Sequence, residues 1–387
     1  MNSVDQLVYT GHGSPERESD LILSLVASGL VRMQGWRGDV DRRRPYDARL
    51  QLGLDRLSVA CARVGVMAPV GVGDLVWDWC AGRPLRDWPL VLDRDVLAGG
   101  ELLLLGGRPS EFCREWVLSA SDVISEVHES SLVNHVKDVA RVLGRPELYA
   151  QWRRTVTRHS VVHTARMLSL KNAFLDVAPW AQWLDESYEP VPVSGSVAGQ
   201  VAVCAGCGQW MTPLASGEWR CPSWRCAVAS RLGEPTMTPA DGLYRLRVEL
   251  VTSVALPGAH ELALAEALAA RGAHVVLSPQ FDALDVWARW PDGYAIGVDV
   301  KDWRNAYLLA RRIKMFPAWS VGHPYAYESG FVAVAADRTG GRDTYLRILR
   351  ARSAALRSQR NVHAVTDREL IESCPDTGVA GEVTCGP

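Results

Sequence analysis

The first half of the chain repeats apolar residues every three or four positions, which is the period of an amphipathic α-helix. Residues 1 to about 189 are therefore predicted to form a mostly α-helical N-terminal region. The clearest helical segments are Ser19–Met33, Asp47–Val64, Arg114–Leu143 and Pro146–Leu170. Tryptophans recur at helical spacing in the same region, and we expect most of them to lie in the core.

A different pattern follows in the last third of the chain, where apolar and polar residues alternate as they do in β-strands. Ala283–Trp290 and Tyr294–Lys301 are two such segments, and the Pro-Asp-Gly sequence between them predicts a tight turn. Counting outward from a three-residue turn places Asp285 directly opposite Asp299, with Cβ atoms about 5 Å apart. The sequence therefore predicts two carboxylates on one face of a hairpin.

Further elements around this hairpin predict a C-terminal α/β domain with a mixed sheet. His260–Gly272 has the pattern of a helix closed by a glycine, and His274–Leu277 is a short apolar strand. A second helix should begin near Arg304. Phe331–Ala335 and Val362–Val365 are expected to add two more strands.

Asp285, Asp299 and Lys301 are the residue types that a metal-dependent phosphodiesterase needs. Two carboxylates so close repel each other unless a cation lies between them, and Mg²⁺ is usually held by one or two carboxylates with water and substrate phosphate. Lys301, on the same face, could orient the attacking water or stabilise charge on the phosphate. The alternative is the polar face of an ordinary hairpin. The chain has four lysines against 38 arginines, so a lysine here is less expected by chance.

Four cysteines between the two regions have the spacing of a metal site, Cys204-x2-Cys207 and Cys221-x4-Cys226. Four thiolates form a closed tetrahedral site, so we expect a structural Zn²⁺ that does not activate water. A small hairpin between the two pairs would make this a zinc ribbon. Disulfides are the alternative, which the paired spacing and the lack of a secretory signal disfavour. The ribbon could grip DNA, dock a partner or brace the fold.

Positive charge is concentrated after the hairpin. Residues 301–360 contain 12 Lys or Arg and four Asp or Glu, whereas the whole chain has a formal net charge of −2. A basic surface beside a metal site attracts the phosphate backbone without reading sequence, although a solvated amphipathic helix is the alternative. The candidate DNA-binding residues are Arg304, Arg311, Arg312, Lys314, Arg347, Arg350 and Arg357. Arg347, Arg350 and Arg357 should lie along one helix.

The order of these elements and acids resembles the PD-(D/E)XK, or restriction-endonuclease-like, nuclease superfamily. Its core carries an acid on the first helix, an Asp on the second strand and (D/E)-x-K on the third. The resemblance assigns these four active-site positions to Glu261, Asp285, Asp299 and Lys301. It implies Mg²⁺ or Mn²⁺ on Asp285 and Asp299, with the backbone carbonyl near Val300 and Glu261 completing the shell. Asp282 competes with Asp285 for its position but lies out of register.

More narrowly, Leu256–Glu261 together with Val298–Trp303 is similar to the endonuclease encoded beside prokaryotic pPIWI-RE proteins. This resemblance implies a defence module with an Argonaute-like pPIWI-RE partner and a helicase, acting on invading plasmid or phage DNA. The family's chemistry implies 5′-phosphate and 3′-hydroxyl ends. With one active site per chain, a double-strand break would need a homodimer or two successive nicks.

The sequence thus predicts three parts: a helical N-terminal region (1–189), a zinc ribbon (197–232) and a restriction-endonuclease-like nuclease domain (243–387). No export signal or membrane span is evident, so we expect a cytoplasmic protein. The chain lacks a P-loop sequence, so ATP-driven unwinding would fall to a partner. Two other functions stay open: an inactive DNA-binding scaffold, and an RNA-processing nuclease that uses the same site.

Overall fold

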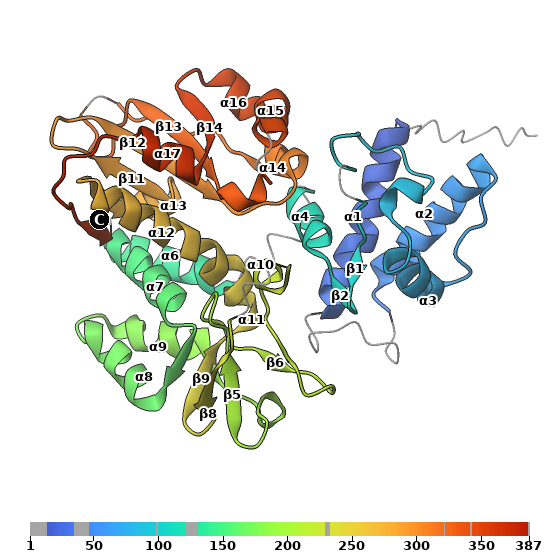
Figure 1. Cartoon of the computed structure of the whole chain (residues 1–387), viewed down its shortest axis with the longest axis horizontal. Coiled ribbons are helices and arrows are strands. Elements are labelled where there is room, and N and C mark those ends of the chain that lie inside the picture. The colour runs from blue at the N-terminus through green and yellow to red at the C-terminus, as the bar shows by residue number, and fades with distance from the viewer. Residues whose placement is uncertain are drawn as a thin grey trace, which may run out of the picture. The chain divides into compact units, whose positions relative to one another are not determined.

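The computed structural model describes residues 14–34, 46–97, 100–120, 131–228, 233–320, 322–340 and 343–385. The chain forms two compact units, Met1–Asp122 with Arg304–Arg312 and Val123–Trp303 with Ile313–Pro387. It therefore leaves the second unit at residue 304 and returns to it at residue 313. Figure 1 labels the elements of both units.

Two long helices dominate the first unit. Its elements are α1 (Pro15–Gln34), α2 (Ala48–Val64), α3 (Val72–Asp74), the π-helix η1 (Leu75–Cys80), the 3₁₀-helix η2 (Leu85–Asp87), β1 (Leu104–Leu105), β2 (Arg108–Pro109), α4 (Glu111–Ser119) and α14 (Ala306–Arg312). Two glycines let α1 and α2 pack closely. A Cβ on Gly29 would lie 2.7 Å from Leu50 Cγ, and a Cβ on Gly53 would lie 2.7 Å from Val26 Cγ2.

Helix α14 belongs to the first unit although it follows the predicted hairpin in sequence. The Glu115 carboxylate accepts hydrogen bonds from the backbone N–H groups of Arg304, at 2.6 Å, and Asn305, at 3.0 Å. The Asn305 side chain in turn accepts from two N–H groups of the first helical turn, which caps the helix. Leu308 and Leu309 are fully buried, and α14 packs against α4.

The second unit begins with a helical part that closes on a small antiparallel sheet of order β3-β9-β4. Its elements are α6 (Ser131–Val142), α7 (Pro146–Arg158), β3 (Val161–His163), α8 (Thr164–Lys171), the 3₁₀-helix η3 (Asn172–Phe174), α9 (Ala178–Ser187), β4 (Tyr188–Pro190), the 3₁₀-helix η4 (Val193–Gly195) and β9 (Leu243–Leu246). Trp152, Trp180 and Trp183 are buried in its core, as their helical spacing predicted.

Two of the predicted helices are wrong in extent. Segment Arg114–Leu143 contains two helices: α4 ends at Ser119, where Ala120 is extended with ψ 107°, and α6 begins at Ser131; residues 121–130 lie outside the described residues. Segment Pro146–Leu170 is interrupted by strand β3. Its β-branched Val161 and Val162 pair with β9, and this tertiary pairing overrides the helical spacing. The helix-rich character of the N-terminal region is confirmed.

The four cysteines lie in a small β-rich module. Strands β5 (Gln200–Val203) and β8 (Thr236–Pro239) pair antiparallel. Strands β6 (Thr212–Pro213) and β7 (Trp219–Arg220) form the small hairpin expected between the cysteine pairs. The short helix α10 (Trp224–Val228) carries the last cysteine.

A six-stranded mixed sheet forms the core of the C-terminal part, as the sequence predicted. Its order is β14-β13-β12-β11-β10-β15, in which β10, β11 and β12 are antiparallel neighbours and the other three pairings are parallel. The strands are β10 (His274–Leu277), β11 (Val286–Arg289), β12 (Ala295–Lys301), β13 (Ser329–Val334), β14 (Val362–Thr366) and β15 (Val383–Cys385).

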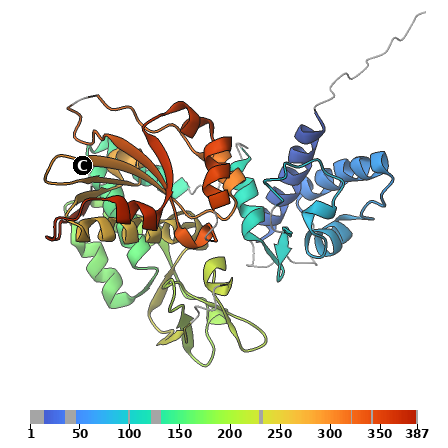
Figure 2. The same ribbon diagram turned by 45° about the horizontal axis from the view of Figure 1, so that its top comes forward.

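Helices α12 and α17 lie side by side on this sheet (Figures 1 and 2) and share a buried core with it, which includes Leu264, Leu268, Val298 and Leu370. The helical elements around the sheet are α11 (Val248–Leu250), the π-helix η5 (Val251–Ala255), α12 (Leu256–Ala270), α13 (Pro279–Asp282), the 3₁₀-helix η6 (Ala336–Arg338), α15 (Asp343–Arg352), α16 (Ala354–Ser358) and α17 (Asp367–Ser373). Among the described residues, no helix is both long and apolar enough to cross a membrane.

The expected single helix through Arg347, Arg350 and Arg357 is wrong. Ser353 separates α15 from α16: its backbone is extended, with ψ 121°, and its buried hydroxyl accepts a hydrogen bond from the N–H of Leu356. A serine in this role starts a new helix, so the three arginines do not share one helical face.

Candidate functional site

The β11–β12 hairpin brings the two predicted carboxylates and the lysine together. Val286 pairs with Val298, in the register that the turn predicted, and the Asp285 N–H donates to the Val298 carbonyl at 3.1 Å, so Asp285 lies just beyond the last pair of the ladder, next to Val298. Lys301 Nζ donates to Asp299 Oδ1 and lies 3.5 Å from Asp285 Oδ2. The same Asp285 oxygen accepts the Val300 N–H at 2.7 Å. The hairpin end thus holds one ammonium between two carboxylates.

Glu261 lies on α12 and is 5% exposed. Its Oε1 is 2.5 Å from Nη2 of Arg153, which projects from α7. Glu261 is thus paired with an arginine. The charges of Asp285 and Lys301 also act on Glu261, so it lies near the hairpin end, although its ion-pair partner is Arg153.

Asp282 occupies a place of its own beside these acids. Its Oδ1 is 2.7 Å from Arg153 Nη1, its Oδ2 is 3.0 Å from Lys137 Nζ, and it accepts a hydrogen bond from the Tyr149 hydroxyl. Asp282 therefore neutralises cations of α6 and α7 and does not replace Asp285 in the hairpin. Arg153, Lys137 and Tyr149 were not among the predicted site residues, because nothing in their local pattern signals contact with residues more than 100 positions away.

Glu261, Asp282, Asp285 and Asp299 form an acid cluster around Lys301 and Arg153. Burial and neighbouring charges change the pKa of three of these carboxyl groups. Burial raises the pKa of Glu261 to about 8, against the opposing charge of Arg153. Burial likewise raises the pKa of Asp299 to about 7, although Lys301 acts in the opposite direction. Burial alone would lower the pKa of Lys301, but the Asp285 and Asp299 carboxylates outweigh it and raise that pKa. Despite burial, the cations Arg153 and Lys137 hold the pKa of Asp282 at about 2.

The four predicted zinc ligands converge in the β-rich module. The Sγ atoms of Cys204, Cys207, Cys221 and Cys226 all lie within 4.8 Å of one another. A hydrogen bond with the Cys221 sulfur lowers the pKa of Cys207 to about 6, which favours the thiolate that a metal takes. All nine cysteines are described and are free, so the disulfide alternative is not what the structure contains. Four sulfurs at this separation fit a tetrahedral Zn²⁺ with bonds of about 2.3 Å.

The acids around Lys301 are not gathered as tightly as the four cysteines. In the described part of the chain, the cysteines are the group of three or more His, Cys, Asp or Glu residues whose ligand atoms all lie within 4.8 Å of one another. Glu261 pairs with Arg153, whereas Asp285 and Asp299 share Lys301. Two carboxylates on one lysine nevertheless make a hard oxygen donor set, which suits Mg²⁺ when water and phosphate supply the other ligands.

The cysteine module contacts both flanks of the acid cluster through Arg225, the residue before Cys226. Arg225 Nη2 lies 2.5 Å from Asp337 Oδ2, and Nη1 lies 3.4 Å from Asp302 Oδ1 and contacts the His260 ring. His260 precedes Glu261 and Asp302 follows Lys301. Burial would raise the pKa of Asp302, but hydrogen bonds from His260 and Arg338 lower it well below its usual value. The ionised Asp302 thus contacts side chains from α10, α12 and η6.

The candidate DNA-binding residues do not all belong to one unit. Arg304, Arg311 and Arg312 lie in the first unit, and Lys314 and the other three arginines lie in the second. Arg311 pairs with Asp20 at 3.1 Å. Arg350 and Arg357 each donate to a backbone carbonyl at 2.6 Å but remain exposed, as do Arg347 and Lys314. The four exposed cations of the second unit remain candidates for a phosphate-binding surface.

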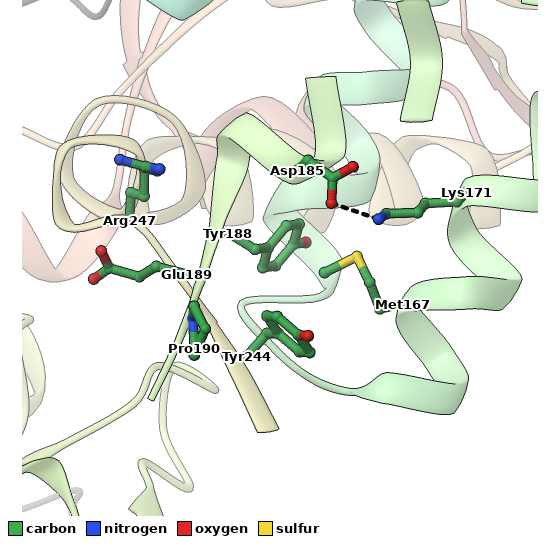
Figure 3. Close-up of a pocket in the computed structure, with 8 residues that line it drawn as sticks. All are labelled: Met167, Lys171, Asp185, Tyr188, Glu189, Pro190, Tyr244 and Arg247. Carbon is green, nitrogen blue, oxygen red and sulfur yellow. Dashed lines mark hydrogen bonds and ion pairs between the residues drawn. The ribbon is translucent and has the colours of Figure 1, made fainter. Parts of the chain in front are cut away.

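A separate pocket of about 330 Å³ opens in the helical part of the second unit (Figure 3). Lys171 and Asp185 form an ion pair there, Tyr188 and Tyr244 lie beside Met167, and Arg247 stands apart from the ion pair. None of the predicted site residues lines this pocket.

Comparison with known families matches two segments of the chain. Residues 22–163 match the pPIWI_RE three-gene island domain Y, and residues 258–376 match the family described as "REase associating with pPIWI_RE". The second match contains the four carboxylates of the acid cluster and Lys301. Their partners Arg153, Lys137 and Tyr149 lie in the first match. No curated protein and no solved structure matches the chain.

Proposed function

We infer from the match of residues 258–376 to the family described as "REase associating with pPIWI_RE" that this chain is a metal-dependent DNA endonuclease. The family match supports the nuclease role. The observation that carries the metal-dependent chemistry is the placement of Lys301 Nζ between Asp285 and Asp299 at the end of the hairpin. We further propose that it acts in the cytoplasm against invading DNA, with a pPIWI-RE protein and a helicase as partners.

In the proposed mechanism, Asp285 and Asp299 would hold Mg²⁺ or Mn²⁺, and the Val300 carbonyl and Glu261 could serve as further ligands. The bound ion would supply Lewis-acid activation of the phosphate and of water. Lys301 orients the attacking water and stabilises the negative charge that grows on the phosphate oxygens. Hydrolysis leaves a 5′-phosphate and a 3′-hydroxyl. Asp285 is kept in place by the N–H of Val300, so its carboxylate is oriented before substrate arrives.

The remaining parts have supporting roles in this proposal. Cys204, Cys207, Cys221 and Cys226 hold a structural Zn²⁺ in a ribbon (197–232), between a helical N-terminal region (1–189) and a nuclease domain (243–387). Lys314, Arg347, Arg350 and Arg357 contact the phosphate backbone from the second unit, and Arg304, Arg311 and Arg312 from the first. Because each chain has one site, a double-strand break takes two chains or two nicks.

Cleavage by the purified full-length chain tests this function. We expect it to nick supercoiled plasmid with Mg²⁺ or Mn²⁺ and to be inactive in EDTA. Single-stranded RNA, single-stranded DNA and duplex DNA of one sequence should be compared at equal concentration. Preference for RNA would identify an RNA-processing nuclease. Binding without cleavage of any of them, including after addition of the pPIWI-RE partner, would identify a scaffold.

The acidity of the cluster predicts a pH-dependent metal affinity. Glu261 and Asp299 have raised pKa values of about 8 and 7. At a pH below these values the carboxyl groups are protonated, and a divalent cation must displace the protons in order to bind. The Mg²⁺ concentration for half-maximal cleavage should therefore fall by at least about tenfold from pH 6 to pH 8, which is the factor for Asp299 alone, and by more if Glu261 must also lose its proton. Mg²⁺ titrations at the two pH values measure this. Replacing Glu261 by Gln should weaken the dependence, and equal half-maximal concentrations in wild type would contradict it.

A further inference from the structure

The acid cluster receives cations from outside the segment that matches the endonuclease family. Arg153 and Lys137 lie on α7 and α6, within the segment that matches domain Y. Arg153 Nη2 is 2.5 Å from Glu261, and Nη1 is 2.7 Å from Asp282. Two family segments thus build one constellation, inside one compact unit.

A glycine in α12 allows α7 to pack closely against it, next to the acid cluster. A Cβ on Gly258 of α12 would lie 2.6 Å from Thr157 Oγ1 of α7, so the glycine permits the close approach of the two helices. Arg153 and Glu261 lie one helical turn away from this contact along their own helices. The pairing of these two side chains is therefore a consequence of tight helix packing.

The segment that carries Asp282 is strained. Ser278, Gln280, Phe281 and Asp282 all have left-handed backbone conformations, with φ between 48° and 63°. Such conformations cost on the order of 1–3 kcal/mol each in residues other than glycine, and they persist where surrounding contacts fix them. Here the contacts come from α7, where Tyr149 packs on Phe281 and binds Asp282. Strain of this kind concentrates at functional sites.

The charges of the cluster match one metal ion and one phosphate. When all four carboxylates are ionised, as metal binding requires, Glu261, Asp282, Asp285 and Asp299 face the three cations Lys137, Arg153 and Lys301, which gives a formal charge of −1 before the metal is counted. One divalent cation changes this to +1, which complements a single phosphodiester. Without Arg153 and Lys137 the same site with one divalent cation would carry −1 and repel the substrate.

We propose that Arg153, assisted by Lys137, is a phosphate-binding residue of the nuclease site, so that the domain Y segment completes the active centre. The inference rests on the proposed nuclease function. A guanidinium suits this role because it can donate two parallel hydrogen bonds to a phosphate. When a divalent cation takes the carboxylates, Arg153 is released from Glu261 toward the substrate. Arg153 Nε is buried and has no hydrogen-bond partner among the described residues, so the guanidinium keeps an unsatisfied donor that a phosphate oxygen could take once the side chain moves.

The test measures DNA binding apart from cleavage. Fluorescence anisotropy of a labelled duplex is recorded with Ca²⁺, used as a divalent cation that should not support cleavage, and with EDTA. Wild type should bind at least about tenfold more tightly with Ca²⁺, and Arg153→Gln should lose this gain, since one charge-assisted contact is worth about tenfold or more. Lys137→Gln should lose part of it. Arg158→Gln is the matched control on α7, because Arg158 forms an exposed ion pair with Glu266.

An Arg153→Gln protein that melts like wild type yet keeps the full Ca²⁺ gain would overturn the proposal and leave Arg153 a structural residue. If Arg153→Gln does not fold, Arg153→Lys decides. A lysine keeps the charge but cannot make the two parallel bonds, so most of the gain should still be lost; an unchanged gain would overturn the proposal. A wild type without any Ca²⁺ gain would refute the metal-dependent function itself, which separates the two failures.

Discussion

Replacement of Lys301 by Met should lower the rate of DNA cleavage by about 1000-fold and leave DNA affinity within about threefold of wild type. The reason is local: Lys301 Nζ is the cation shared by Asp285 and Asp299, and its loss removes the group placed to stabilise charge at phosphorus. The loss also leaves Asp299 without the charge that opposes the rise of its pKa. Single-turnover cleavage and anisotropy binding of the same duplex measure the two quantities.

Lys171→Met is the matched control, because it removes a lysine of the same unit that pairs with Asp185 away from the hairpin. It should cleave like wild type. Asp299→Ala should resemble Lys301→Met in losing cleavage more than affinity. A comparable loss of both in Asp299→Ala would mean that Asp299 is structural, and cleavage retained by Lys301→Met would exclude Lys301 from the chemistry.

Loss of one zinc ligand should disable the nuclease from a distance. Cys221→Ser is expected to reduce bound zinc from about one ion per chain to almost none, because the remaining thiolates no longer close the tetrahedron. We expect cleavage to fall by at least about tenfold, since Arg225, beside Cys226, no longer holds His260 and Asp302 in place. If loss of the metal lowers the free energy of unfolding by about 3 kcal/mol, the Tm should fall by about 6–12 °C.

Three variants separate the metal from its mechanical effect. Cys374→Ser replaces a buried free cysteine outside the module and should keep zinc and activity. Arg225→Ala should keep zinc yet lose cleavage, and Arg225→Lys should recover part of it. Atomic absorption gives the zinc content of each protein. Full cleavage by zinc-free Cys221→Ser would show that the module serves another purpose, such as binding a partner.

The parts of the fold that the sequence predicted well are those controlled by local rules. The Pro-Asp-Gly turn fixes the register of β11 and β12, and this register brings Asp285 and Asp299 to the same end of the hairpin. The cysteine spacing likewise determines where four sulfurs can meet. The mixed sheet followed from the order of its strands. In each case neighbouring residues carry the information.

What could not be predicted depends on contacts between distant segments. The pairing of Arg153 with Glu261 requires the crossing of α7 and α12, and neither helix signals it. Asp282 turns toward α7 through a run of left-handed residues that lacks glycine, the usual signal for such a conformation. The division of Pro146–Leu170 by β3 has the same cause, since β9, its partner strand, lies about 80 residues later. Tertiary pairing decided these elements against local propensity.

The path of the chain through α14 constrains how the nuclease could be moved between proteins by recombination. A gene fragment beginning at residue 131 would encode the whole acid cluster and the cysteine module, together with α14. That helix would lack α4 and the Glu115 cap, so Leu308 and Leu309 would face water at a cost of about 1.5–3 kcal/mol each. We therefore expect a fragment that lacks α4 to aggregate more readily than the full chain.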